Sequence, residues 1–362
     1  MSKIAFIGIC VFITAHCCVA STTDMNSSTV TVFSVGLPEQ SDKTLQFAAS
    51  ELAKYFKLMT QREYPIKDSN GATDNSVLLN INQNLQHDGY RIFQNGSSIC
   101  ITGGSSRGCL YGAYTLLQEL GCRFPLPGRD NEVIPALKSI SWSSLPVESE
   151  PAVKHRGIIF FPFNWGEDVI EMIDYMAKNR YNFIFIHTGG PVPDEFVPKL
   201  KTTLDARDMG IELGGHLLPG YLPRELFKDH PEYFRMENGK RTDKLNMCPS
   251  SPEAADIIAR NSLKDWAKCG DLSRFEMLNM WPDDLFGGGW CSCDKCKNLS
   301  PSDQGLKIIN EVAQRLSLKS ETSIAHLSYH DTLECPTTIK PYAKVKLLFC
   351  PRERCYRHNI MG

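Results

Sequence analysis

The feature that most restricts the fold is a regular alternation of short apolar runs and amphipathic segments from His155 onward. The apolar runs predict buried strands, and the segments between them carry apolar residues at helical spacing. Repeated strand–helix units of this kind form a parallel sheet, either an open doubly wound sheet or a barrel. The six predicted strands are residues 157–161, 181–186, 211–215, 275–281, 324–329 and 345–350.

Amphipathic helices are predicted between these strands, over residues 169–176, 197–209, 252–266 and 304–318. A barrel of about eight units needs more strand–helix units than these strands provide. We therefore expect residues 151–362 to form part of a (β/α)8 TIM-type barrel, truncated after strand six. The predicted fold class is α/β.

A smaller α/β domain is predicted over residues 29–140, ahead of a proline-containing linker that ends at Pro151. Asp42 is a suitable N-cap for a helix with apolar residues at helical spacing, and Asn95-Gly96 is a hairpin turn signal. The glycine-rich loop 103–108 lacks the Lys-Ser/Thr pair of a phosphate-binding P-loop. A tight turn from strand to helix is therefore the better interpretation of that loop.

The first 20 residues have the pattern of a secretory signal peptide. Lys3 precedes an apolar run over residues 4–14, and Cys18-Val19-Ala20 offers small residues for cleavage after Ala20. No later segment is apolar enough to cross a bilayer, so we expect a secreted or periplasmic protein without a membrane span. The net charge of -2 gives no reason to expect a nucleic-acid partner.

Polar and aromatic side chains follow the predicted barrel strands. The C-terminal ends of barrel strands meet at one face, where such folds place their sites. For any single histidine or arginine, helix capping or solvation explains the position at least as well, but the whole series suits a polyhydroxylated ligand. We expect these residues to line a sugar site: Asn164, Trp165, His187, His216, Tyr329, His330 and Arg352.

Two adjacent carboxylates, Asp283 and Asp284, follow the fourth strand, which Pro282 ends. Hydrolysis of a glycosidic bond needs one protonated carboxyl for the leaving oxygen and a second carboxylate. Adjacent acids suit a substrate-assisted mechanism, in which one acid orients a 2-acetamido group and its neighbour protonates the leaving group. The alternative interpretation is a helix N-cap and a solvated loop acid. The sequence thus predicts a glycoside hydrolase with a carbohydrate substrate.

A C-x-C-x-x-C motif closes the same stretch. Cys291, Cys293 and Cys296, together with Cys248 from an earlier loop, could form a four-cysteine zinc site. In an exported protein one disulfide plus a thiol is an equally good interpretation. Four thiolates leave no open position for catalysis, so we expect at most a structural zinc and no catalytic cofactor.

Four motifs occur together in residues 150–355, and in this combination the second half resembles the uncharacterised domain family numbered 4838. The resemblance implies a barrel domain of exported bacterial proteins associated with polysaccharide breakdown. It also adds Arg156 to the expected substrate-binding residues. The motifs are Arg156-Gly157, Gly214-Gly215-His216 with His230-Pro231-Glu232, Asp284 ahead of the cysteine motif, and Asn310-Glu311-Val312-Ala313.

The first half, through residues 101–112, resembles the small α/β domain that precedes the barrel in α-glucuronidases and β-hexosaminidases. Arg156-Gly157 and Asp283-Asp284 are also similar to β-N-acetylglucosaminidases of glycoside hydrolase family 84. That similarity implies Asp284 as the general acid and Asp283 as the group that holds the acetamide. The Asp-Glu pair of family 20 is absent. An α-glucuronidase-like hydrolase, in which Arg352 or Arg354 pairs with a uronate, and a non-catalytic glycan-binding protein are the alternatives.

Overall fold

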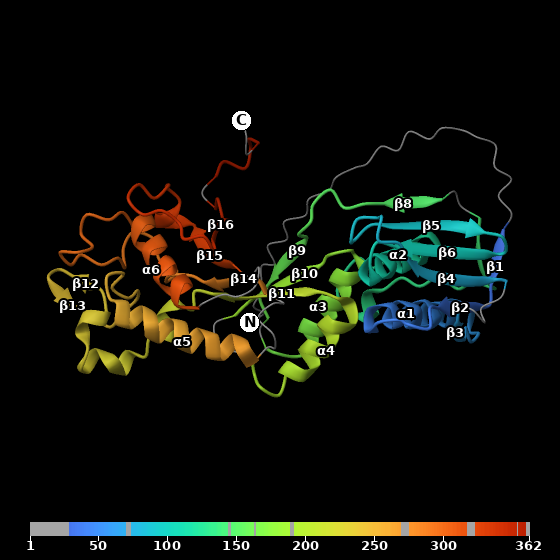
Figure 1. Cartoon of the computed structure of the whole chain (residues 1–362), viewed down its shortest axis with the longest axis horizontal. Coiled ribbons are helices and arrows are strands. Elements are labelled where there is room, and N and C mark those ends of the chain that lie inside the picture. The colour runs from blue at the N-terminus through green and yellow to red at the C-terminus, as the bar shows by residue number, and fades with distance from the viewer. Residues whose placement is uncertain are drawn as a thin grey trace, which may run out of the picture.

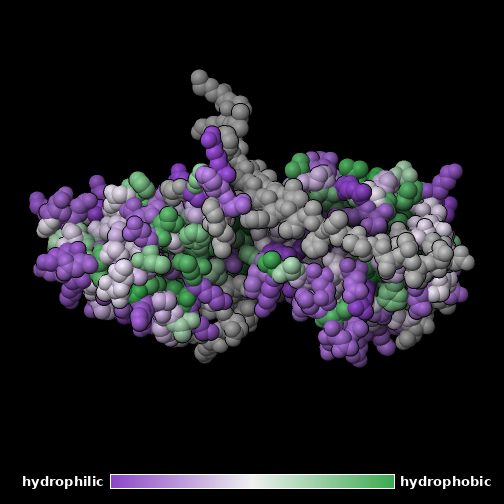
Figure 2. Space-filling view, turned by 90° about the horizontal axis from the view of Figure 1, so that it is seen from above, coloured by the Kyte–Doolittle hydropathy of each residue, from purple (hydrophilic) through white to green (hydrophobic). Residues whose placement is uncertain are grey.

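The computed structural model describes residues 29–69, 74–143, 146–162, 164–188, 192–268, 275–316, 323–352 and 354–359. The predicted signal peptide lies outside these residues. The described chain forms two lobes that lie end to end (Figure 1). The view from above shows the same two lobes, with hydrophilic and hydrophobic residues interspersed on their surfaces (Figure 2).

The first lobe is a mixed six-stranded sheet in the order β3-β2-β4-β6-β5-β8, with a separate pair, β1 and β7. Strands β3, β2, β4 and β6 run parallel, while β5 pairs antiparallel with both β6 and β8. Its elements are β1 (Val30–Val32), β2 (Ser34–Leu37), α1 (Lys43–Thr60), β3 (Ile66–Asp68), β4 (Ser76–Ile81), β5 (Tyr90–Asn95), β6 (Ser98–Gly103), α2 (Ser106–Glu119), η1 (Arg129–Asn131), β7 (Ile140–Trp142) and β8 (Val147–Ser149).

The expected cap and turn of this lobe are both present. The Asp42 carboxylate accepts a hydrogen bond from the backbone N–H of Leu45 at 2.8 Å and so begins α1. The loop after β6 is a tight strand-to-helix turn, because Ser105 caps α2 and a Cβ on Gly104 would lie 1.9 Å from the carbonyl oxygen of Gln86. The segment expected to be a linker contributes two strands, since β7 pairs with β1 and β8 pairs with β5.

The second lobe contains six parallel strands whose order in the sheet follows the sequence, β9-β10-β11-β14-β15-β16. This is the strand order of a (β/α)8 barrel, and the sheet is a parallel half-barrel. Its helices and strands are β9 (Gly157–Phe160), α3 (Glu167–Lys178), β10 (Phe183–His187), α4 (Val197–Arg207), β11 (Gly210–Gly215), η2 (Leu218–Tyr221), η3 (Arg224–Lys228), η4 (Pro231–Tyr233), β12 (Met236–Glu237), β13 (Lys240–Arg241), α5 (Pro252–Lys268), β14 (Phe275–Met280), α6 (Pro301–Leu316), β15 (Ser323–Ser328), η6 (His330–Thr332) and β16 (Val345–Phe349).

The half-barrel has a separate apolar core on each face. On the outer face, side chains such as Ile184 and Ile186 of β10 belong to the main core, which also contains the helices. On the inner face, Phe185 clusters with Trp281, Ala325 and Leu327. This alternation is what period-two side-chain geometry requires of a sheet buried on both faces. All six predicted strands and all four predicted helices of this lobe are confirmed to within a few residues.

Buried charges join the two lobes at the N-terminal edge of the half-barrel. Asp88 of the first lobe is 7% exposed and accepts hydrogen bonds from Arg156 (2.6 Å) and Asn182 (2.9 Å) of the second. Arg107 donates to the same carboxylate at 2.8 Å and also to the backbone carbonyl of Asp208. Burial opposes ionisation of Asp88, but these guanidinium groups hold the pKa of its carboxyl below the usual range.

A second charged group crosses the same interface around Lys178, which is 1% exposed. Its ammonium donates to Glu132 of the first lobe at 2.6 Å and to Asp174 of its own helix. Arg207 donates to the other oxygen of Asp174 at 2.5 Å, while the Tyr55 hydroxyl donates to Glu132 at 2.7 Å. The interface is therefore fixed by a paired, hydrogen-bonded network rather than by apolar contact alone.

Candidate active site

The C-terminal edge of the half-barrel brings together aromatic side chains from five strands. His187 ends β10, His216 follows β11, Trp281 follows β14, and Tyr329 follows β15. Ring centroids are 5.3 Å apart for His187 and Trp281, 5.2 Å for His216 and Trp281, and 6.3 Å for His216 and Tyr329. Phe161, after β9, stacks on His187 at 4.3 Å. We call these five side chains the aromatic wall.

Two glycines at the end of β11 allow this close arrangement. A Cβ on Gly214 would lie 1.6 Å from the carbonyl oxygen of Asn279 in β14, and one on Gly215 would lie 2.7 Å from Nε2 of His187. Both residues have positive φ, 133° and 152°. The Gly-Gly-His sequence therefore lets β11 approach β14 and makes room for His187 in the aromatic wall.

Asp284 lies beside the aromatic wall. Its Oδ1 is 3.8 Å from Nε2 of His216. Nδ1 of His216 donates to the carbonyl oxygen of Pro282 at 2.5 Å, which orients the ring with Nε2 toward Asp284. Burial, together with the charge of His216, lowers the pKa of His187, and Asp284 opposes that shift. The site thus pairs an exposed carboxylate with one oriented imidazole and one imidazole that favours its neutral form.

Asp283 has different surroundings from its neighbour. Its backbone N–H donates to the side-chain oxygen of Asn246 at 2.8 Å. Burial lowers the pKa of Arg224, and Asp283 lies close enough to oppose that shift. Of the two carboxylates, Asp284 is the one that lies within 4 Å of a side chain of the aromatic wall.

Two further predicted residues, His330 and Arg352, lie beside Tyr329 after β15 and β16. Tyr329 and His330 have ring centroids 3.8 Å apart. Nη1 of Arg352 lies 3.1 Å from the Tyr329 hydroxyl and 2.8 Å from Nε2 of His330. Burial raises the pKa of Tyr329, while the hydrogen bond from Arg352 opposes that rise. This end of the site offers hydrogen-bonding groups next to an aromatic face.

The remaining predicted residues lie elsewhere. Arg156 is at the opposite, N-terminal edge of the half-barrel, where its guanidinium bonds Asp88 and the carbonyl oxygens of Arg180 and Val153. The prediction that Arg156 lies with the sugar-site residues is therefore wrong. Its guanidinium pairs with Asp88 across the interface between the two lobes. Trp165 packs on Phe196 at 5.6 Å against the main core, and Asn164 beside it is exposed.

Two residues that sequence reasoning missed hold the loop after Asp284. The Asp331 carboxylate accepts hydrogen bonds from the backbone N–H of Gly287 (2.9 Å) and Gly288 (3.1 Å) and from the Trp290 indole (3.2 Å). Asn246 is 1% exposed, and its amide also donates to the carbonyl oxygen of Gly289 at 3.1 Å. The one available signal was the run of three glycines, whose exposed N–H groups need an acceptor.

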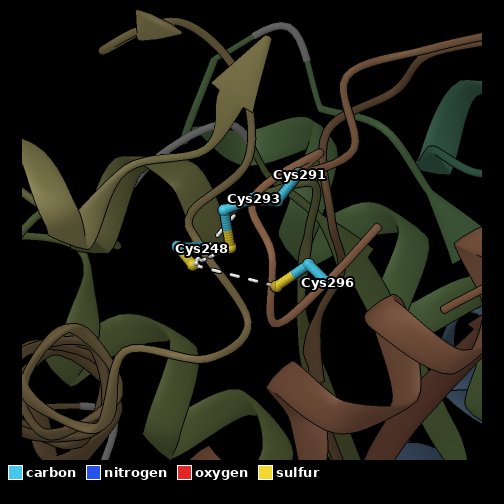
Figure 3. A group of neighbouring side chains, drawn as sticks. All are labelled: Cys248, Cys291, Cys293 and Cys296. Carbon is cyan, nitrogen blue, oxygen red and sulfur yellow. Dashed lines mark hydrogen bonds between the residues drawn. The ribbon is translucent and has the colours of Figure 1, made fainter. Parts of the chain in front are cut away.

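The four predicted cysteines converge in space although Cys248 is distant in sequence (Figure 3). Sγ of Cys248 lies 3.7 Å from that of Cys291 and 3.9 Å from those of Cys293 and Cys296, and all four sulfurs lie within 4.8 Å of one another. Four sulfurs around zinc at about 2.3 Å are about 3.8 Å apart, whereas a disulfide needs about 2.05 Å. The spacing fits a tetrahedral metal site and is too long for a disulfide.

The surroundings of these sulfurs also fit a metal. All four cysteines are buried, and the backbone N–H of Met236 donates to the sulfur of Cys291 at 3.3 Å. Hydrogen bonds among the sulfurs lower the pKa of Cys248 and raise the pKa values of Cys291 and Cys296, so these three thiols titrate as one group. The buried amide of Gln304 bonds the backbone N–H of Cys291 at 2.9 Å and its carbonyl oxygen at 3.1 Å.

A cavity of about 310 Å³ lies on the inner face of the half-barrel. It is lined mainly by apolar side chains, including Ile159, Phe185 and Leu348, with Glu212 and Lys346 among them. It lies deeper in the half-barrel than the strand-end residues, and neither Asp283 nor Asp284 lines it. The cavity is the interior of the half-barrel rather than the candidate active site.

Two family models match this chain, and each match corresponds to one of its two lobes. The model described as Domain of unknown function (DUF4838) matches residues 126–362, and that of glycosyl hydrolase family 20, domain 2, matches residues 26–141. These matches confirm the resemblance of the second half to family 4838 and that of the first half to the small α/β domain of β-hexosaminidases. No match was found among curated proteins. None of the described helices is long and apolar enough to span a membrane.

Several solved structures share the fold. A β-N-acetylhexosaminidase of family 20 from Streptomyces coelicolor A3(2) is 13% identical, with a TM-score of 0.63 over 92% of this chain and 69% of its own. A β-N-acetylhexosaminidase from Bacteroides fragilis is 12% identical, with a TM-score of 0.60 over 89% and 68%. An exo-β-N-acetylglucosaminidase from Vibrio harveyi, solved with N-acetylglucosamine, is 14% identical, with a TM-score of 0.57 over 84% and 53%. The chain thus spans 53% to 69% of these proteins and has a glycoside-hydrolase-like fold.

Proposed function

The chain belongs to the family described as Domain of unknown function (DUF4838), and we propose that it hydrolyses a glycosidic bond of an oligo- or polysaccharide. The observation that carries the proposal is Asp284, placed at the C-terminal end of the fourth barrel strand and 3.8 Å from His216. The aromatic wall beside it suits a sugar ring, since aromatic faces pack against apolar C–H groups. The likeness to β-N-acetylhexosaminidases in fold supports an N-acetylhexosaminide as the substrate class.

In the proposed reaction Asp284 is the general acid. It gives its proton to the leaving oxygen as the acetamide oxygen of the substrate bonds to the anomeric carbon. Water then attacks that carbon, loses a proton to the Asp284 carboxylate and restores the acetamide. His216, oriented by the carbonyl oxygen of Pro282, places its Nε2 3.8 Å from the Asp284 carboxylate. That Asp283 orients the acetamide stays a prediction.

The test is turnover on a panel of aryl glycosides that includes N-acetylglucosaminide and glucuronide. Asp284→Asn keeps the shape of the side chain but removes its proton, so we expect turnover to fall by about a hundredfold or more. Asp294→Asn is the matched control, because Asp294 lies on the same loop, is exposed and pairs only with Lys297 among the described residues. Turnover unchanged in Asp284→Asn would rule out this acid.

Two alternatives give other results on the same panel. Release from the glucuronide alone, lost in Arg352→Ala, would favour an α-glucuronidase-like enzyme, because an arginine pairs well with a uronate. Arg352 already bonds Tyr329 and His330 at the site. Glycan binding without turnover would favour a non-catalytic glycan-binding protein.

We also propose that Cys248, Cys291, Cys293 and Cys296 bind one structural zinc, and that residues 1–20 export the protein. Four cysteine ligands fill a tetrahedral zinc, so the metal would hold the loop after Asp284 and take no part in proton transfer.

The zinc prediction is tested by metal content and thermal stability. We expect about one zinc per chain by elemental analysis, and we expect Cys293→Ser to lose metal and lower the Tm by several degrees. Cys335→Ser is the matched control, since Cys335 is an exposed thiol outside the cluster. A metal-free protein that is as stable as one purified with added zinc would contradict the proposal.

A further inference from the structure

The loop between Asp284 and Cys291 holds an aromatic ring in solvent at the rim of the site. Phe286 is 76% exposed, the largest exposed fraction among the exposed large hydrophobic side chains of the described residues. Its ring meets that of His330 edge to face, with centroids 5.3 Å apart. An apolar ring in water contributes no burial free energy to folding. Packing in the hydrophobic core therefore does not account for a phenylalanine at position 286.

The backbone beside Phe286 is held by a partly buried carboxylate. Asp331 accepts hydrogen bonds from the N–H groups of Gly287 and Gly288 and from the indole of Trp290. Although burial opposes it, these bonds hold the pKa of Asp331 below its usual range, so the carboxylate is ionised at neutral pH. The positive φ angles of Gly287 and Gly288 let both N–H groups reach it.

The loop is also fixed on the other side of Phe286. The buried amide of Asn246 bonds the N–H of Asp283 at 2.8 Å and the carbonyl oxygen of Gly289 at 3.1 Å. Cys291 then enters the cysteine cluster. Ordering a loop costs about 1–2 kcal/mol of backbone entropy per residue. Here that ordering presents an apolar ring to solvent, which is the arrangement of a preorganised binding surface.

We infer that Phe286 is a stacking platform for one pyranose ring of a glycan, next to the sugar whose bond Asp284 would cleave. The inference rests on the proposed function. A pyranose presents a face of C–H groups that packs on an aromatic ring and a rim of hydroxyls that needs hydrogen-bonding partners. The Tyr329 hydroxyl, His330 and Arg352 supply such partners on the side of Phe286 that His330 contacts.

The test is binding of hexasaccharides to the Asp284→Asn protein, in which turnover does not interfere. The probes are hexamers of N-acetylglucosamine, glucose and galacturonate, measured by titration calorimetry. We expect Phe286→Ala to weaken the Kd of at least one hexamer about tenfold or more and Phe286→Tyr to stay within about threefold, because tyrosine keeps the ring. Phe33→Ala is the matched control, since Phe33 is 59% exposed on the first lobe.

The other possible results separate the stacking platform from the proposed function. Equal Kd values for Phe286→Ala and its parent, or no hexamer bound at millimolar concentration, would overturn the inference. So would a Phe286-dependent dimer in sedimentation, because a second copy would then be the occupant of the ring. If the wild-type protein hydrolyses aryl glycosides but hexamer binding does not depend on Phe286, the proposed function stands and the stacking platform is contradicted. If hexamer binding depends on Phe286 but the wild-type protein hydrolyses no aryl glycoside, the stacking platform stands and the hydrolase proposal is contradicted.

Discussion

His326 is a buried histidine whose side chain lies beside Gly305 of α6. It is 4% exposed, and neither ring nitrogen has a hydrogen-bond partner among the described residues. Burial lowers its pKa to about 4, so the ring is neutral in the folded protein at pH 7. In the unfolded chain the pKa is about 6.5. Because the unfolded state binds the proton more tightly, acid favours unfolding.

This histidine should make stability depend on pH. Its contribution is fully present above about pH 6.5 and is lost as the pH falls toward 4, which amounts to about 2–3 kcal/mol at pH 4.5. We expect His326→Leu to remove that part of the pH dependence in urea unfolding at pH 8 and pH 4.5. His358→Leu, at an exposed histidine, is the control. A stability difference between His326→Leu and wild type that is equal at both pH values would contradict the prediction.

Single residues show which features could be proposed from the sequence and which could not. Asp284 and the cysteine motif could be proposed because the residues that suggest their chemistry are neighbours in the sequence. Asn246 and Asp331 were missed because each is an ordinary polar loop residue whose partners lie 37 to 44 positions away. Arg156 was misplaced for the same reason, since its partner Asp88 belongs to the other domain.

At the scale of elements, the loop after β14 depends on the Asn246 amide, which holds both of its ends. Removing the amide leaves the N–H of Asp283 and the carbonyl oxygen of Gly289 without this partner, at a cost of about 1–3 kcal/mol. We expect Asn246→Ala to lower kcat on the best aryl glycoside by about tenfold or more, because Asp284 loses its backbone support.

Asn310→Ala is the matched control for that loop. The Asn310 amide likewise bonds two backbone groups, the carbonyl oxygen of Lys340 at 2.8 Å and the N–H of Tyr342 at 2.9 Å, but it lies on α6. It should lower stability without a comparable fall in kcat. Equal effects of the two variants on kcat would mean that Asn246 acts on stability alone.

The elements themselves were largely predictable. Apolar runs and helical spacing gave the strands and helices of the half-barrel, since burial on both faces leaves a simple pattern. The short strands β3, β7 and β8 were not found, because three residues are too few to show a period and their pairing partners decide their structure. The positions of His187, His216 and Tyr329 in the aromatic wall followed from parallel order. Phe161 and Trp281 were expected only as strand residues, and the contacts of Asp283 depended on loop geometry.

At the scale of the whole molecule, Asp88 ties the two lobes together. Removing one member of a buried ion pair leaves its partners unpaired, so we expect Asp88→Asn to lower the free energy of unfolding by about 3 kcal/mol or more. Glu148→Gln, which breaks the exposed pair with Arg91, should cost under about 1 kcal/mol. Urea unfolding measures both, and equal effects would show that the interface charge adds no stability.

The charged interface between the lobes has a consequence for how such proteins can be recombined. Lys178 and Arg156 of the barrel lobe each meet their carboxylates on the other lobe, Glu132 and Asp88. A barrel joined to a small domain from a distant relative would bury these cations opposite unmatched groups. A stable chimaera would therefore need both carboxylates carried across with the barrel.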